Sequence, residues 1–146
     1  MPKTEFEFEK LLLYQEARAF RCRIFKLSRL LPKSEFKLAG QMRDAGRSLT
    51  NCIAEGHGRY TFRDRVHFCR QSRGSLCELV DDINICSDEG YAKPEHLETL
   101  RDDAAKLLKR LNSYMKYLTV EGKKLAALNR RPQPTKTIRQ LPITNY

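Results

Sequence analysis

Four long segments of this chain repeat apolar residues at helical spacing, and this repetition limits the fold more than any other feature. In each segment the apolar positions step by three and four residues, which places them on one face of a helix. Proline or glycine residues fall between the segments, so we expect the chain to turn there. The sequence therefore predicts an all-α fold, an antiparallel up-down four-helix bundle with crossing angles of about +20°.

The boundaries of the four predicted helices follow from breakers and caps. Pro32 ends the first helix, and Ser34 is the expected N-cap of the second. Thr61 and Asp64 form a threonine-x-x-acid pair, close to a capping box for the third helix. Gly90 is placed to end that helix in a left-handed cap. The predicted helices span residues 11–31, 35–54, 62–89 and 95–120.

The sequence divides into a bundle and two terminal segments. Residues 1–10 alternate acidic and aromatic side chains, typical of a short strand, an arm across a neighbour or a loosely held terminus. Residues 11–121 are the expected bundle. Residues 122–146 form a predicted basic tail, with six Lys or Arg and no acid. Three prolines prevent one continuous helix there, so the tail is either flexible or orders on a partner.

The junction between the second and third predicted helices contains two glycines. We expect Gly56 and Gly58 to allow unusual backbone conformations and a close approach of the two helices. Arg73 interrupts the apolar stripe of the third helix, and a charge there needs a partner. Glu55 and Glu78 are the candidates, of which Glu55 would join the two helices. The predicted structural corner comprises Glu55, Gly56, Gly58, Arg73 and Gly74.

Composition bounds the class of protein. The 146 residues fit one domain, and no apolar run or N-terminal signal core predicts a membrane span or export. The five cysteines are an odd number without a CxxC pair, so we expect no metal site and mostly buried, reduced thiols in a cytoplasmic protein. These cysteines are Cys22, Cys52, Cys69, Cys77 and Cys86.

The candidates for catalysis are weak. His57, His67 and His96 fall on different predicted elements, and His57 between two glycines is typical of a turn residue. No GKS or GKT follows these glycines, so they do not form a phosphate-binding loop. Glu55 has the chemistry of a general acid or base, but we expect it to pair with Arg73. The sequence predicts a protein that is not an enzyme and has no cofactor.

Charge is the more informative signal. The net charge is +10 and the pI about 9.6, which favours polyanionic partners, nucleic acid before membrane surfaces. Basic residues dominate 10–33, 59–73 and the tail, whereas 78–103 carry nine acids and two bases. We expect phosphate contacts with little base specificity. Tyr60 and Phe62 either stack on an unpaired base or are a surface and a core residue, respectively, of which we favour the second. The predicted nucleic-acid-binding residues are Arg18, Lys26, Arg29, Arg59, Arg63, Arg70, Lys123, Lys124, Arg130 and Arg131.

Five short blocks of sequence carry a family resemblance. They are LYQEA at 13–17, QMRDA at 41–45, IAEGHGR at 53–59, RGSLCEL at 73–79 and GY at 90–91. The sequence resembles the four-helix-bundle family of intervening sequences in 23S ribosomal RNA genes over about residues 11–118. The family usually has Pro and Asn where this chain has Thr50 and Cys52.

The resemblance implies a homopentamer of bundles, no known catalytic site and an association with RNA. Proteins of related fold also serve as accessory subunits of the reverse transcriptases of diversity-generating retroelements. A reverse transcriptase is therefore one expected partner. The alternative is a protein-protein interaction scaffold, in which the tail docks on a partner and basic residues pair between subunits.

Overall fold

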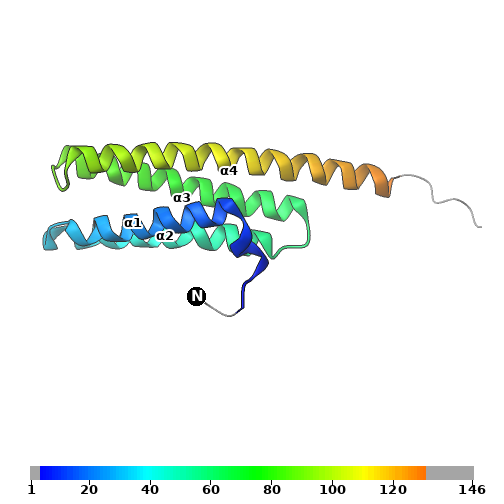
Figure 1. Ribbon diagram of the computed structural model, residues 1–146, viewed down its shortest axis with the longest axis horizontal. Coiled ribbons are helices and arrows are strands. Elements are labelled where there is room, and N and C mark those ends of the chain that lie inside the picture. Colours follow the sequence, from blue (N-terminus) through cyan, green and yellow to red (C-terminus); the bar gives the residue numbers. More distant parts are fainter. Residues whose placement is uncertain (1–3, 131–146) are drawn as a thin grey trace, which may run out of the picture.

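The described part of the chain forms four long helices, and consecutive helices run in opposite directions (Figure 1). The computed structural model describes residues 4–130, and within that range no strand occurs. The predicted all-α four-helix bundle is confirmed. Each helix contacts the next one along the chain, and α1 also contacts α4, which closes the bundle. The elements are η1 (Glu7–Lys10), α1 (Leu12–Leu30), η2 (Lys33–Glu35), α2 (Phe36–His57), α3 (Phe62–Asp88) and α4 (Pro94–Asn129).

The apolar stripes form one hydrophobic core along the axis of the bundle. Most predicted stripe positions are buried, including Ile24 on α1, Leu49 on α2 and Leu111 on α4. Four positions of the predicted stripes lie one residue away from the buried one. The residues buried instead of the predicted Cys52, Arg73, Val80 and Tyr114 are Ile53, Ser72, Leu79 and Met115. Adjacent positions both fit a step of three and four, so spacing alone does not choose between them.

The turn between α1 and α2 differs from the prediction. α1 ends at Leu30, before Pro32, as expected. A 3-10 turn then forms, in which the amide of Glu35 donates to the carbonyl of Pro32 at 2.9 Å. Ser34 lies inside this turn, and α2 begins after Glu35 without a side-chain cap. The prediction of Ser34 as the N-cap is therefore wrong.

Both ends of α3 agree with the sequence. The hydroxyl of Thr61 accepts a hydrogen bond from the amide of Asp64 at 3.1 Å, which caps the first turn. Gly90 has φ +68°, and the amide of Tyr91 donates to the carbonyl of Cys86 at 2.9 Å. This is the Schellman arrangement, which satisfies carbonyls that the end of a helix leaves unpaired.

α4 is longer than predicted and extends beyond the other three helices (Figure 1). Pro94 occupies its first turn, and the helix continues to Asn129 instead of ending near residue 120. Gly122 lies within it, although we expected that glycine to follow its end. A Cβ added to Gly122 would lie 3.1 Å from Cβ of Phe62, so the missing side chain brings α4 close to α3. The expected boundary at residue 121 thus crosses a helix, and residues 131–146 of the predicted tail lie outside the described residues.

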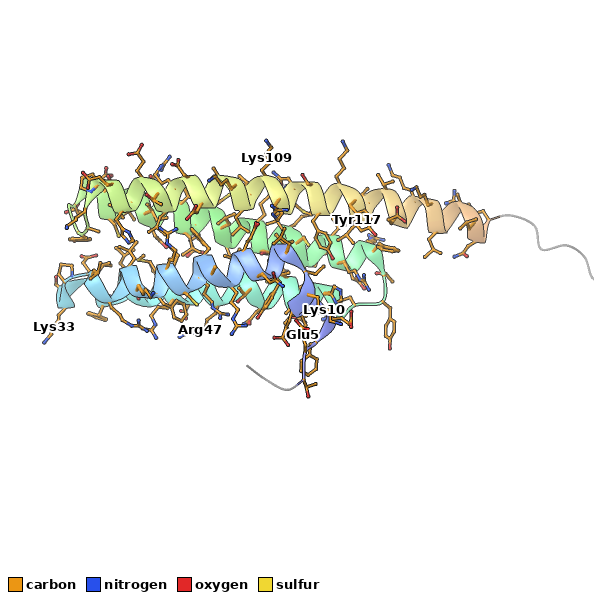
Figure 2. The ribbon with its side chains drawn as sticks, viewed as in Figure 1. Glu5, Lys10, Lys33, Arg47, Lys109 and Tyr117 are labelled. Atoms are coloured by element: carbon orange, nitrogen blue, oxygen red, sulfur yellow. The ribbon has the colours of Figure 1, made fainter. Side chains whose placement is uncertain are left out.

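The N-terminal arm packs against the start of the bundle. Glu7–Lys10 form a 3-10 turn, so the strand interpretation is wrong for these residues. The ring of Phe8 meets that of Tyr14 edge to face, with centroids 4.9 Å apart. Lys10, labelled in Figure 2, is exposed and pairs with exposed Glu7 at 2.7 Å. None of the helices within residues 4–130 carries an apolar stretch of the kind that a membrane span requires.

Candidate nucleic-acid interface

The corner between α2 and α3 depends on one of its two glycines. Gly56 is buried, and a Cβ added there would lie 2.8 Å from Cβ of Phe68, closer than real side chains approach. The predicted close approach is confirmed at this position. Gly58 has φ −76°, an ordinary helical value. The expected unusual backbone conformation is therefore wrong for Gly58, and Gly90 alone has a positive φ within residues 4–130.

The expected ion pair across this corner does not form. Glu55 accepts a hydrogen bond from Arg59 at 2.7 Å, one turn further along the chain. Arg73 is exposed and donates to the side-chain oxygen of Asn112 at 3.2 Å, so it joins α3 to α4. Gly74 is exposed and close to no neighbour. Buried Ser72 takes the connecting role instead, because its hydroxyl donates to the carbonyl of Leu49 at 2.7 Å.

A groove of about 590 Å³ lies between the first turns of α3 and the last turns of α4. Phe62 and Leu118 are among the apolar residues that line it. Arg63 and Arg70 come from α3, and Lys123 comes from α4. No Asp or Glu is among the described residues lining this groove. The structure thus brings together three of the ten predicted binding residues, and the prediction that placed Lys123 in a separate tail is corrected.

The three basic residues of this α3–α4 groove are exposed. Within residues 4–130 they form no ion pair and no side-chain hydrogen bond, so their donors face solvent. Arg63 and Arg70 lie seven residues apart, which places them on one face of α3 about 10 Å apart along its axis. Exposed guanidinium groups at this spacing suit successive contacts with phosphate oxygens.

The remaining predicted residues do not join this groove. Arg59 pairs with Glu55, and its guanidinium lies 4.8 Å from the ring centroid of Phe68. Lys124 pairs with Glu121 at 3.1 Å. Arg130 caps the end of α4, and Arg131 lies outside the described residues. The three predicted residues on α1, all exposed and in no ion pair within residues 4–130, are Arg18, Lys26 and Arg29.

A second group of arginines, which the sequence analysis missed, lies between α1 and α2. The guanidinium groups of Arg43 and Arg47 lie 4.9 and 5.7 Å from the ring centroid of Phe25. Phe25 contacts α2 closely because Gly46 presents no side chain to it. The four-residue step from Arg43 to Arg47 was a usable signal. The role of Phe25 could not be predicted from the sequence, because its contact with Gly46 depends on how the two helices pack.

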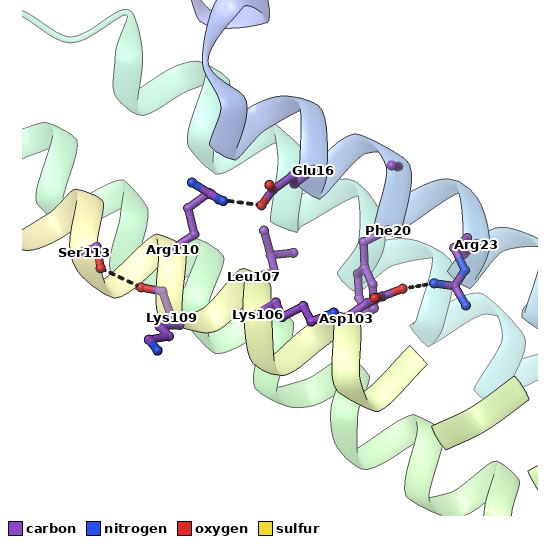
Figure 3. A pocket seen from close by; sticks show the side chains of 10 residues that line it. Glu16, Phe20, Arg23, Asp103, Lys106, Leu107, Lys109, Arg110 and Ser113 are labelled. Atoms are coloured by element: carbon purple, nitrogen blue, oxygen red, sulfur yellow. Dashed lines mark hydrogen bonds and ion pairs between the residues drawn. The ribbon is translucent and has the colours of Figure 1, made fainter. Parts of the chain in front are cut away.

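A second groove of about 590 Å³ separates α1 from α4 (Figure 3). Arg110 on α4 pairs with Glu16 on α1 at 2.6 Å. Arg23 on α1 pairs with Asp103 on α4. Both ion pairs therefore join α1 to α4, and the arginine comes from α4 in the first pair and from α1 in the second. Arg23 belongs to the basic range 10–33, which the sequence analysis assigns to contacts with a polyanion. Its charge instead meets an acid within the bundle.

The cysteines and histidines add no reactive cluster. All five thiols are free, but the expectation that most are buried is wrong, since Cys22 and Cys77 are exposed and Cys52 is half-buried. Burial raises the pKa of Cys69 and of Cys86 to about 11, which keeps these thiols protonated at neutral pH. Residues 4–130 contain no group of three His, Cys, Asp or Glu side chains able to hold a metal ion.

The fold and its surface define a class of protein, a basic all-α four-helix bundle with exposed arginines. The sequence model of the 23S rRNA-intervening sequence protein family matches residues 9–113, and the chain belongs to this family. The match spans α1, α2 and α3 and the first half of α4, and it stops before the helical turns that form one wall of the α3–α4 groove. A search of curated proteins found no match.

The two departures from the usual family pattern both make side-chain contacts. Thr50 is buried in α2, and its hydroxyl accepts a hydrogen bond from Arg21 of α1 at 2.9 Å. A proline at this position could not make that contact. Cys52 lies 3.7 Å from the side-chain oxygen of Gln71 on α3. Thr50 therefore adds a polar connection between α1 and α2.

Proposed function

We propose that this protein is a non-enzymatic bundle that binds RNA, mainly through contacts with phosphates. The observation that carries the proposal is the α3–α4 groove, where Arg63, Arg70 and Lys123 converge and no Asp or Glu is among the described lining residues. Cations that already pair with carboxylates gain little from a phosphate, whereas exposed and unpaired ones release counterions when a polyanion binds. The net charge of +10 raises the local concentration of RNA around the whole molecule.

Membership of the 23S rRNA-intervening sequence protein family supports RNA over other polyanions. We propose that the protein acts in the cytoplasm as a homopentamer, because the family resemblance implies that assembly. A reverse transcriptase of a diversity-generating retroelement is the proposed protein partner. Native mass spectrometry tests the assembly, and a purely monomeric protein at micromolar concentration would contradict it.

Salt-dependent RNA binding tests the main proposal. The full-length protein is titrated into a labelled structured RNA at several salt concentrations, beside the variant Arg63→Glu/Arg70→Glu. We expect the variant to bind at least tenfold more weakly, with a shallower dependence on salt, because two phosphate contacts are lost. Circular dichroism checks that both proteins remain helical.

A matched control separates the groove from general charge. Lys33 and Lys37 are exposed and form no ion pair within residues 4–130. Lys33 lies at the opposite end of the bundle (Figure 2), and Lys37 follows it in the first turn of α2. Lys33→Glu/Lys37→Glu changes the net charge equally and should weaken binding less than threefold. Equal losses in both variants would make the groove irrelevant. Wild-type binding that vanishes at physiological salt would contradict the proposed function itself.

One observation favours a second candidate, a protein-interaction scaffold. The last turns of α4 expose large apolar side chains, with exposed fractions of 43% for Val120, 49% for Leu125 and 57% for Leu128. Such a surface is typical of contacts with another protein. Leu128→Glu should abolish self-association in sedimentation velocity if this surface joins subunits. RNA binding that persists in the dissociated variant would assign the two functions to different surfaces.

A further inference from the structure

We propose that the α3–α4 groove takes an unpaired base of the bound RNA strand, while its basic rim holds the adjoining phosphates. This inference rests on the proposed RNA binding and adds a specific ligand to it. It assigns the groove a preference for single-stranded segments. Duplex RNA keeps its bases stacked and paired, so it can offer only phosphates and ribose hydroxyls to such a site.

The lining of the groove has the two kinds of surface that a nucleotide needs. Half-buried Phe62 on α3 and exposed Leu125 and Ala126 on α4 provide apolar surface, whereas Val66 and Leu118 of the lining are buried. The volume of about 590 Å³ falls within the range of small-molecule sites. A groove that served phosphates alone would gain nothing from this apolar area, which a flat nucleobase can cover.

Tyr60 supplies an aromatic face at the edge of the same groove. Its side chain is fully exposed, and it stacks on no other aromatic ring among the described residues. An aromatic side chain in this state is available to stack on a base, and such stacking tolerates any base type. Asn129 also lines the groove, and its amide can donate to or accept from a base edge.

The basic residues surround the groove from two sides. Arg63 and Arg70 lie along α3, and Lys123 lies across from them on α4. Because about 10 Å of helix axis separates the two arginines, they would contact different phosphates of one strand. A strand that follows this rim would direct one of its bases toward the apolar lining.

The test compares three labelled RNA probes on the full-length protein by fluorescence anisotropy. They are a single-stranded oligonucleotide, an abasic strand with the same number of phosphates, and a duplex of the same length. We expect the wild type to bind the single strand roughly tenfold more tightly than the abasic strand, which is the effect of about one stacked base. The duplex offers phosphates but no unpaired base, so its affinity should not depend on the apolar lining of the groove.

Two variants locate the base. Ala126→Gln covers part of the apolar lining with a polar, uncharged side chain that has no aromatic face, and it should reduce the ratio of single-strand to abasic affinity to less than threefold. The adjacent Ala127 is exposed and does not line the groove, so Ala127→Gln is the matched control and should keep the preference. Tyr60→Ala removes a side chain that makes no packing contribution to stability, and it should also lower the preference.

The outcomes separate this inference from the proposed function. Equal wild-type affinity for the single strand and the abasic strand would overturn the base site and leave phosphate-led RNA binding intact. A preference that survives both Ala126→Gln and Tyr60→Ala would also overturn it, because the base would lie elsewhere. Failure of all three probes to bind at physiological salt would instead overturn the proposed function.

Discussion

Two grooves of similar volume lie beside α4, and they differ in what their charged residues contact. In the α1–α4 groove both arginines are paired, Arg110 with Glu16 and Arg23 with Asp103. Lys106 and Lys109 of the same lining form no ion pair within residues 4–130. In the α3–α4 groove, Arg63 and Arg70 have no acidic neighbour in the lining. The total charge of the chain does not distinguish these two sites. The pairing of their arginines distinguishes the two sites. An arginine neutralised by an acid holds helices together, whereas an unpaired arginine remains available to a ligand.

Asp82 sharpens this comparison because it is an unpaired charge inside the bundle. Its Oδ2 atom is buried and has no hydrogen-bond partner among the described residues. Burial, followed by repulsion from Glu78 and Asp81, raises the pKa of Asp82 from 3.8 to about 6. The folded protein therefore holds this proton more tightly than the unfolded chain. The contribution of Asp82 to the free energy of unfolding falls as the pH rises from about 4 to about 6.

The largest predicted effect follows from removing this charge. Asp82→Asn should raise the free energy of unfolding at pH 7 by about 2–3 kcal/mol, and the gain should shrink toward pH 4. Urea denaturation of wild type and variant at both pH values measures it. Asp81→Asn is the control, since Asp81 is exposed and its removal should change the free energy by less than about 1 kcal/mol. A gain independent of pH would refute the assigned cause.

The contact between α2 and α3 at Gly56 extends the comparison from grooves, where two helices are separated, to a place where two helices pack directly. Gly56→Ala would place a Cβ 2.8 Å from Cβ of Phe68, so the helices must move apart. We expect a loss of roughly 1–3 kcal/mol in the free energy of unfolding. Gly58→Ala is the matched control, because its nearest contact is 3.4 Å away and its φ is ordinary, and it should change the value by less than about 0.5 kcal/mol. Similar thermal midpoints for the two variants would show that Gly56 does not set the spacing.

Sequence patterns predicted the helices well because each stripe combines evidence from many residues. They did not fix which of two adjacent residues is buried, as Ser72 and Arg73 show. The end of α4 was missed for a related reason. Glycine commonly ends a helix, but Gly122 continues one because it packs against Phe62, more than fifty residues away in the chain.

The candidate site was predictable only in part. The shared helix face of Arg63 and Arg70 follows from their spacing of seven residues, so the sequence identified half of the groove. Lys123 could not be assigned to it, because its position depends on the unexpected length of α4. Nor could charge patterns separate Arg23, which is paired with Asp103, from its exposed neighbours on α1.

Removing the acids of the α1–α4 groove should make it resemble the α3–α4 groove. Glu16→Gln/Asp103→Asn frees Arg110 and Arg23, and we expect RNA affinity to rise by roughly tenfold at low salt, with a slope steeper by about 1.4 for single strands. Fluorescence anisotropy over a salt series measures both quantities.

The control for this conversion changes the net charge by the same amount at a site without ion pairs. Glu95 and Glu98 are exposed near the start of α4 and form no ion pair with a basic residue within residues 4–130. Glu95→Gln/Glu98→Gln should raise the affinity less than threefold. If both double variants gain equally, RNA responds to total charge alone, and the difference between the two grooves loses its functional meaning.

The smallest predicted effect is the coupling energy of the paired charges themselves. A double-mutant cycle with Arg23→Ala and Asp103→Ala should give about 0.5–1 kcal/mol, because these side chains are only 30% and 38% exposed. The pair between Asp44 and Arg47 is 78% and 51% exposed and should give about 0.3 kcal/mol, a value that vanishes in 1 M salt. Urea denaturation of each set of variants supplies the four free energies. Equal couplings would mean that the α1–α4 pairs are ordinary surface contacts, and acids would then line that groove without holding its helices together.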